Sequence, residues 1–406
     1  MKNRLKRPQV EVAQVIRQFG PAFRASRKVP TQHIRTLQAL QQCRTAELGG
    51  HIDYCSACQQ VIRLSYNSCR NRHCPKCGGL ERELWIQERE RELLPLSYYH
   101  VVFTIPEQLN EWCMHNPRFC YNLLFQAAWQ SLHTFGQDQK YLGAQIGATM
   151  VLHTWGQNLS LHPHVHAIVP AGGINKSKQW TSPKRKSGFL FPVKAMSRVF
   201  RAIFLKAFLK AWNNGQLSSP PNAPKTAKQR KQWREQRYQQ AWVVYAKAPF
   251  AGPKAVVEYL GRYTHKVAIS NHRIIKIDEH KVHFRYKDYR QNGQSKCMSL
   301  DGVEFLRRFC LHILPPGFRR MRHYGFLANR SKAQNLAIAR KALNVVAKPL
   351  KQSSRKERKT QLLEKLLGRP LNVCTHCGCL DTIIELPIPA LKRQRAPPVS
   401  TNTPRK

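Results

Sequence analysis

The stretch that decides the fold is "ATMVLHTWGQNLSLHPHVHAIVPAGG", which runs from Ala148 to Gly173. Its β-branched and apolar ends predict two strands joined by the polar turn "QNLSLHP". Side chains on a strand alternate between its two faces, so His162, His164 and His166 point the same way. One interpretation is the polar face of a half-exposed strand. The other is a metal site, because neutral imidazole is a common ligand.

The overall composition indicates a large basic protein with a folded interior. The chain has 406 residues, of which 42% are hydrophobic, enough for two or three domains. It carries 68 Lys and Arg against 22 Asp and Glu, a formal net charge of +46. A polyanion relieves such self-repulsion, and nucleic acid is favoured over a membrane surface. We see no apolar run of about 18 residues and no signal peptide, so we expect a soluble intracellular protein.

The thirteen cysteines indicate a metal site rather than disulfides, because no secretion signal accompanies them. Four of them form the pattern C-x2-C-x15-C-x2-C, a spacing typical of a tetrahedral zinc ribbon. They are Cys55, Cys58, Cys74 and Cys77, with Cys69 and His73 as alternative ligands. Accidental cysteines are the competing interpretation. A module of this size needs the metal to fold.

A second cysteine cluster lies far along the chain, in "VCTHCGC". It contains Cys374, Cys377 and Cys379, which form one C-x2-C pair with an extra cysteine. One such pair is weaker evidence for metal than two, so a second zinc site stays open.

The chain reads as several successive segments. They are an N-terminal helical segment (1–45), a zinc-binding module (46–80), a connecting helix (81–97), a main domain (98–335), a C-terminal helical region with the second cysteine cluster (336–380) and a disordered basic tail (381–406). Strands interleaved with helices, without regular βαβ units, predict an α+β main domain with an antiparallel sheet. A basic insertion near 176–240 has two proline-containing stretches that we expect to be mobile. Between them, an apolar stripe from Met196 to Phe208 predicts a core-packing helix.

A second polar constellation occurs in "EYLGRYTHK", where Tyr259 and Tyr263 stand four residues apart on a predicted helix. Both phenols then lie on one helix face. They are either two core aromatics or a pair of nucleophiles. A divalent ion held by the histidines can polarise a phosphodiester, which a tyrosine then attacks to form a phosphotyrosine and a free 3′ hydroxyl.

These motifs carry a resemblance to a known family. "HPHVH" and "YLGRYTH" resemble the HUH class of single-strand endonucleases, and specifically the two-tyrosine rolling-circle transposases of the IS91 family. "SCRNRHCPKC", "VVFTIPEQL", "YLGRYTHKVAIS" and "RHYGFLANR" are similar to segments of that family in the same order. The resemblance runs from roughly Gln42 to Leu380.

The resemblance implies a fold and roles for particular residues. The fold is the HUH nuclease domain, a central antiparallel sheet flanked by helices. His164 and His166 match the metal ligands, Tyr259 and Tyr263 match the nucleophiles, and either His162 or His153 supplies the third ligand. The implied cofactors are catalytic Mg²⁺ or Mn²⁺ and structural Zn²⁺. The implied partners are single-stranded element ends and target DNA in the bacterial cytoplasm, with the end held as a 5′-phosphotyrosine.

Three rival functions remain beside this one. A related HUH replication initiator or relaxase shares the same site chemistry, but no G-x4-G-K-[ST] helicase motif is present. A transposase with three carboxylates lacks a convincing acidic trio. A catalytically silent zinc-containing DNA-binding protein explains the charge and the cysteines, but makes the histidine strand and the tyrosine pair coincidental. The DNA sequences, the order of the tyrosines and the oligomeric state stay open.

Overall fold

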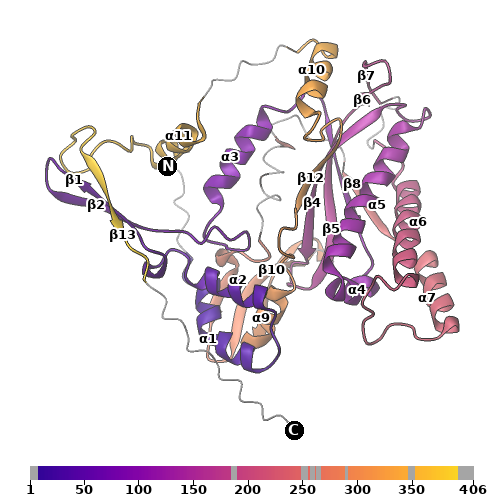
Figure 1. Ribbon diagram of the computed structural model, residues 1–406, viewed down its shortest axis with the longest axis horizontal. Coiled ribbons are helices and arrows are strands. Elements are labelled where there is room, and N and C mark those ends of the chain that lie inside the picture. The colour runs from indigo at the N-terminus through magenta and orange to yellow at the C-terminus, as the bar shows by residue number, and fades with distance from the viewer. Residues whose placement is uncertain are drawn as a thin grey trace, which may run out of the picture.

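The structure is a computed structural model that describes residues 8–183, 190–247, 255–256, 261, 267–288, 291–345 and 353–391. Within these ranges it is an α+β protein, and three groups of elements are visible in Figure 1. A large sheet packs against long helices, a smaller helical group carries a second sheet, and a third sheet projects at one end. No helix of the described ranges combines the length and apolar character of a membrane span.

The central sheet has the order β7-β6-β4-β5-β3-β8, with β12 also paired to β4. All of these pairings are antiparallel. The strands are β3 (Tyr98–Thr104), β4 (Gln145–Trp155), β5 (Leu161–Pro170), β6 (Gly173–Ile174), β7 (Trp180–Thr181), β8 (Val243–Lys247) and β12 (Met321–Gly325). The two strands expected from "ATMVLHTWGQNLSLHPHVHAIVPAGG" are the adjacent central pair β4 and β5. The expected antiparallel α+β fold is confirmed.

Two long helices, α5 (Pro117–Gln137) and α6 (Val193–Asn213), cover one face of this sheet. Alternate strand residues such as Phe103, Leu152 and Val165 are fully buried against them in the largest hydrophobic core. The predicted stripe of α6 is confirmed, because Met196, Phe200, Phe204 and Phe208 all have at most 1% of their surface exposed. The strand residues that alternate with these point to the opposite face of the sheet.

The basic insertion contains one ordered element that the sequence analysis missed. Residues 218–240 were expected to be mobile, but α7 (Ala227–Gln239) forms there. The hydroxyl of Thr226 caps the helix by accepting a hydrogen bond from the backbone N–H of Gln229 at 3.2 Å. Trp233 packs against Trp212 of α6 with 5.4 Å between ring centroids. The N-cap of Thr226 and the packing of Trp233 thus stabilise a helix in a segment whose prolines predicted mobility.

The main core gives a direct stability prediction at Phe200. Its ring is fully buried and lies 5.2 Å from that of Phe103 and 5.4 Å from that of Trp242. We expect Phe200→Ala to lower the free energy of unfolding by about 3–5 kcal/mol, because it leaves a cavity. Leu366→Ala on an exposed helix face, where 66% of the side chain is accessible, should change it by less than about 0.5 kcal/mol. Denaturant titrations of both variants provide the measurement, and equal shifts would contradict the packing described.

The N-terminal helices belong to a second core. Helices α1 (Val12–Ala25) and α2 (Thr31–Gln41) pack with α9 (Gly302–Cys310) and with a sheet of order β11-β10-β9. Its strands are β9 (Ile274–Ile277), β10 (Lys281–Asp288) and β11 (Gln294–Asp301), preceded by the short turn η3 (Asn271–Arg273). At Gly302 an added Cβ would meet the ring of Phe19 at 2.2 Å, so only glycine allows α9 to approach α1 so closely. Helices α1 and α2, from the predicted N-terminal segment, are thus built into the fold together with residues of the main domain.

The third sheet joins residues far apart in the sequence. It has the order β13-β1-β2, from β1 (Gly50–Cys55), β2 (Gln60–Tyr66) and β13 (Ile383–Ile388). Along β1 and β13, the register runs from Gly50 opposite Ile388 to Cys55 opposite Ile383. The expectation that a disordered tail begins at 381 is therefore wrong for this strand. Pairing with β1 orders a segment whose local sequence looked like a tail.

The remaining helices connect these groups. They are η1 (Ala46–Leu48), α3 (Gly79–Glu90), η2 (Glu107–Leu109), α4 (Asn110–His115), α10 (Lys332–Ala342) and α11 (Arg355–Leu367). The connecting segment 81–97 was expected to be a helix ending at Pro95, and α3 ends somewhat earlier, at Glu90. An ion pair between Arg358 and Glu88, 3.4 Å apart, ties α11 to α3.

Candidate active site

Three histidines gather on the face of the central sheet opposite α5 and α6. His164 and His166 lie on β5, and His153 lies on β4 directly across from His164. One ring nitrogen from each of the three lies within 4.8 Å of the others. The ring centroids are 4.6 Å apart for His153 and His166 and 4.9 Å apart for His164 and His166. Such a group can hold one metal ion.

The structure separates the two candidates for a third ligand. His153 belongs to the three-histidine group and has only 2% of its surface exposed. His162 is exposed and lies outside that group, although its ring is 5.1 Å from that of His164. The pairing of β4 with β5 shifts register between His153 and Trp155, and this irregularity takes His162 out of line.

Hydrogen bonds orient the rings of His164 and His166. His166 Nδ1 lies 2.9 Å from Nε2 of His100, a buried residue of β3 whose ring stacks on it. His164 Nδ1 lies 2.6 Å from the backbone carbonyl oxygen of His162, to which it can donate. Each contact engages Nδ1, so Nε2 would be the coordinating atom if these two rings bound a metal ion, as in many protein metal sites.

Sequence reasoning missed His100. Its signal was a lone histidine in the apolar strand "YYHVVFT", at an even spacing from Val102 and Thr104. Those two residues pair with His166 and His164, so all of them share one face. A single histidine in an apolar strand reads as a core residue until the partner strand is known.

The paired tyrosines, Tyr259 and Tyr263, lie outside the described residues. Two described residues nearby are informative. Val256 is fully buried in a cluster with Tyr98 and Ile168, and Ile168 is on the histidine face two residues beyond His166. At Gly261 an added Cβ would meet Ile86 of α3 at 2.1 Å. Trp85 of α3 also packs against the cluster of Val256, so Val256 lies between the histidine face and α3, and Gly261 lies against α3.

The cysteines divide differently from the sequence prediction. The expected set of Cys55, Cys58, Cys74 and Cys77 is not brought together. One group consists of Cys43, Cys69, Cys74 and Cys77, and the other of Cys55, Cys58, Cys374 and Cys377, each with its sulfur atoms within 4.8 Å of one another. Cys69, weighed as an alternative ligand, thus lies in the first group, whereas His73 and Cys379 lie outside both.

The β1–β2 hairpin explains this division. Cys55 and Cys58 lie at its turn, whereas Cys43 precedes β1 and Cys69 follows β2 at its open end. A hairpin with strands of six residues separates its two ends by about 20 Å, too far for one ion. The C-x2-C-x15-C-x2-C pattern gives only the number of residues between cysteines along the chain. It therefore contains no information on this separation in space.

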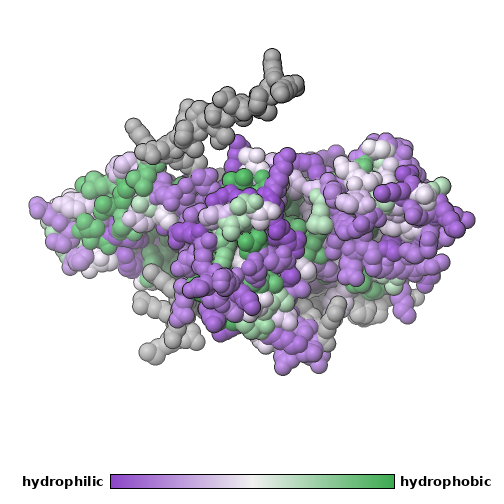
Figure 2. Space-filling view, turned by 90° about the horizontal axis from the view of Figure 1, so that it is seen from below, coloured by the Kyte–Doolittle hydropathy of each residue, from purple (hydrophilic) through white to green (hydrophobic). Residues whose placement is uncertain are grey.

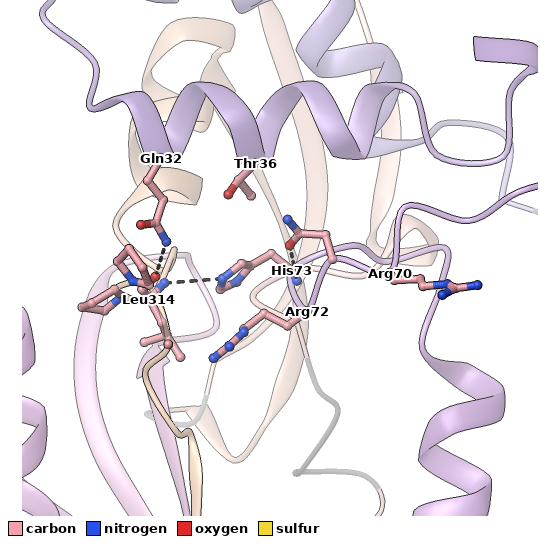
Figure 3. Close-up of a pocket in the computed structure, with 10 residues that line it drawn as sticks. Gln32, Thr36, Arg70, Arg72, His73 and Leu314 are labelled. Atoms are coloured by element: carbon pink, nitrogen blue, oxygen red, sulfur yellow. Dashed lines mark hydrogen bonds between the residues drawn. The ribbon is translucent and has the colours of Figure 1, made fainter. Parts of the chain in front are cut away.

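A basic pocket of about 240 Å³ adjoins the first cysteine group (Figure 3). It is lined by Gln32 and Thr36 of α2, by the residues between Cys69 and Cys74 (Arg70, Asn71, Arg72 and His73), and by Leu314, Pro315, Pro316 and Gly317. His73 points toward Leu314, whose backbone N–H lies 3.4 Å from its Nε2, while Arg70 points away from the other lining side chains. Burial and the neighbouring Arg72 lower the pKa of Arg320 to about 10. Arg320 is not among the lining residues, whereas Arg70 and Arg72 are, and guanidinium groups suit an anion such as a phosphate.

Comparisons with known proteins agree with this architecture. Residues 147–335 match a family described as "Putative transposase", and residues 15–105 match a family described as "Transposase zinc-binding domain". The chain is 44% identical over 372 residues to "Putative transposase y4qJ" of Sinorhizobium fredii, covering 90% of this chain and 92% of that protein. It is 29% identical over 318 residues to "Transposase for insertion sequence element IS801" of Pseudomonas savastanoi pv. phaseolicola, covering 77% and 74%. No solved structure matches.

The fold, the histidine face and both family matches define a transposase with an attached zinc-binding domain. The chain belongs to the IS91 family of insertion-sequence transposases. The zinc-binding match contains all four cysteines of the first group but only Cys55 and Cys58 of the second. DNA is the partner on which such a protein acts.

Proposed function

We propose that this transposase cuts and rejoins single-stranded DNA through 5′-phosphotyrosine intermediates formed by Tyr259 and Tyr263. The observation that carries the proposal is the cluster of His153, His164 and His166 on the face of the antiparallel sheet opposite α5 and α6. A net charge of +46 supplies affinity for the DNA backbone. The basic pocket beside Arg70 and Arg72 is one place for a backbone phosphate.

The donor set fits a divalent cation. Three imidazoles supply three nitrogen atoms on one side, and two of the rings are oriented through Nδ1 by His100 and by the carbonyl of His162. Mn²⁺ or Mg²⁺ bound there would polarise a phosphodiester oxygen and offset its growing negative charge. We infer that His153, His164 and His166 are its ligands.

The chain's own chemistry is tyrosine nucleophilic substitution. The phenolate oxygen of one tyrosine attacks phosphorus, the bond from phosphorus to the 3′ oxygen breaks, and that oxygen leaves as a hydroxyl after taking a proton. A 3′ hydroxyl of another strand reverses the step and releases the phenol. With a pKa near 10, a phenol leaves more readily than a serine alkoxide, so joining needs no ATP.

Two tyrosines extend this chemistry from cutting to transfer. One can hold the first DNA end while the other attacks the second end or the target. Repeated cutting and joining of one strand is the logic of rolling-circle transposition. Val256, three residues before Tyr259, packs on the histidine face beside Ile168, and this placement supports the assignment.

The test is the formation of a covalent adduct. Purified protein is incubated with Mn²⁺ or Mg²⁺ and labelled single-stranded oligonucleotides from both flanks of its own gene. We expect a denaturant-resistant, protease-sensitive adduct at the 5′ phosphate of the piece downstream of the cut, and a free 3′ hydroxyl on the upstream piece. It should disappear in the double variant Tyr259→Phe, Tyr263→Phe and in His164→Ala.

A matched control is Tyr245→Phe on β8, which changes a half-exposed tyrosine of the same sheet face and should keep the adduct. DNA binding without an adduct under any condition would favour a catalytically silent DNA-binding protein. An adduct that survives in the double tyrosine variant would reject the assigned nucleophiles.

A further inference from the structure

The second cysteine group has the dimensions of a metal site. Cys55 Sγ lies 3.8 Å from Cys377 Sγ, and Cys58 Sγ lies 3.7 Å from Cys374 Sγ. In a tetrahedral zinc site with Zn–S bonds of about 2.3 Å, neighbouring sulfur atoms are about 3.8 Å apart. The same separation is far too long for disulfides, whose S–S bond is about 2.05 Å.

We propose that Cys55, Cys58, Cys374 and Cys377 bind a second structural Zn²⁺, distinct from the site of the first cysteine group. Four thiolates favour zinc over harder ions such as Mg²⁺. The ion would clasp the β1–β2 hairpin to a segment more than 300 residues further along the chain. We call this group the clasp.

Hydrogen bonds around the clasp are those that stabilise thiolate ligands. The hydroxyl of Thr382 lies 3.2 Å from Cys55 Sγ, and the backbone N–H of His376 lies 3.4 Å from Cys374 Sγ. Gly378 adopts a φ of +75°, and its N–H bonds to the carbonyl of Cys374 at 3.1 Å. A tight turn with N–H groups directed at sulfur is what a Cys-x2-Cys metal turn requires.

The sheet that carries the clasp lacks a hydrophobic core of its own. Among the described residues, no buried hydrophobic cluster contains a member of β1, β2 or β13. Several apolar side chains of this sheet are instead open to solvent, and hydrophobic atoms gather at that end of the molecule in Figure 2. They are Val61, Leu64, Ile384 and Leu386, with exposed fractions of 57%, 51%, 48% and 44%. A small sheet without a core needs a cross-link, and a zinc ion supplies one.

The test compares metal content in full-length protein. Wild type, the double variant Cys374→Ser, Cys377→Ser and the matched control Cys379→Ser are purified and assayed for zinc per chain. We expect the double variant to lose one equivalent relative to wild type, and the control to lose none. Cys379 is the appropriate control because it is exposed and lies outside both cysteine groups.

Two further readouts keep the test decisive. In cobalt-substituted protein, the thiolate-to-cobalt absorption reports only cysteine sites, and we expect the double variant to keep about half of it. Hydrogen exchange should speed up in residues 50–66 and 383–388, while α5 and α6 keep their protection. Unchanged zinc content together with unchanged cobalt absorption in the double variant would overturn the proposal.

Discussion

We expect His153→Ala to lower the rate of DNA cleavage by at least about 100-fold, whereas His162→Ala should change it by less than about 3-fold. The reason is that the nitrogen of His153 lies within 4.8 Å of those of His164 and His166, and His162 lies outside that group. Loss of a residue that merely orients a metal ligand costs about 10–100-fold, so loss of a ligand should cost at least as much. Single-turnover adduct formation across a Mn²⁺ titration measures the effect.

A control must separate loss of the metal ligand from a packing defect at His153. His153 has 2% of its surface exposed, so an alanine there leaves a space. His153→Gln keeps most of the volume and should show the same loss of cleavage with a thermal midpoint close to wild type. If His162→Ala proves the more damaging variant, the assignment of the third ligand is reversed.

We expect Cys43→Ser to remove one zinc per chain and to destabilise the N-terminal core by at least about 3 kcal/mol. Cys43 is fully buried among the side chains of α1, α2 and α9, with its sulfur in the first cysteine group. Structural zinc contributes about 10–16 kcal/mol of apparent binding energy in small domains, and a serine cannot replace the thiolate. Denaturant unfolding and zinc analysis of the same sample provide the measurement.

Cys297→Ser is the matched comparison for this second effect. Cys297 lies on β11 of the same part of the fold but is exposed and belongs to neither cysteine group. It should retain the zinc and the stability of wild type. A Cys43→Ser variant that also kept both would contradict a zinc site at this group.

The central pair of strands was predictable because its information is local. Alternating histidines, β-branched residues and a polar turn specify β4 and β5 without knowledge of the rest of the chain. The apolar stripe of α6 specified its buried face in the same way. Strand alternation placed His162, His164 and His166 on one face, and the choice of His164 and His166 came from the resemblance to the HUH motif.

Features that depend on which strands pair, and in which register, were not predictable. The division of the cysteines follows from the length of the β1–β2 hairpin and from the arrival of β13 beside β1. The choice of His153 over His162 depends on a register shift between β4 and β5. The contact of His100 with His166 depends on β3 being the neighbour of β5. None of these relations leaves a period or a spacing in the sequence.

The pairing of β1 with β13 also means that this sheet cannot be completed until late in translation. Residue 55 leaves the ribosome more than 300 residues before its partner at 383 is made. At about 5–20 residues per second, the hairpin waits for roughly 20 to 70 s with an open edge strand and apolar side chains in water. During that interval it is exposed to proteases and to wrong pairing with other chains. A chain that stops before residue 383 therefore lacks the strand that pairs with β1 and cannot complete this sheet.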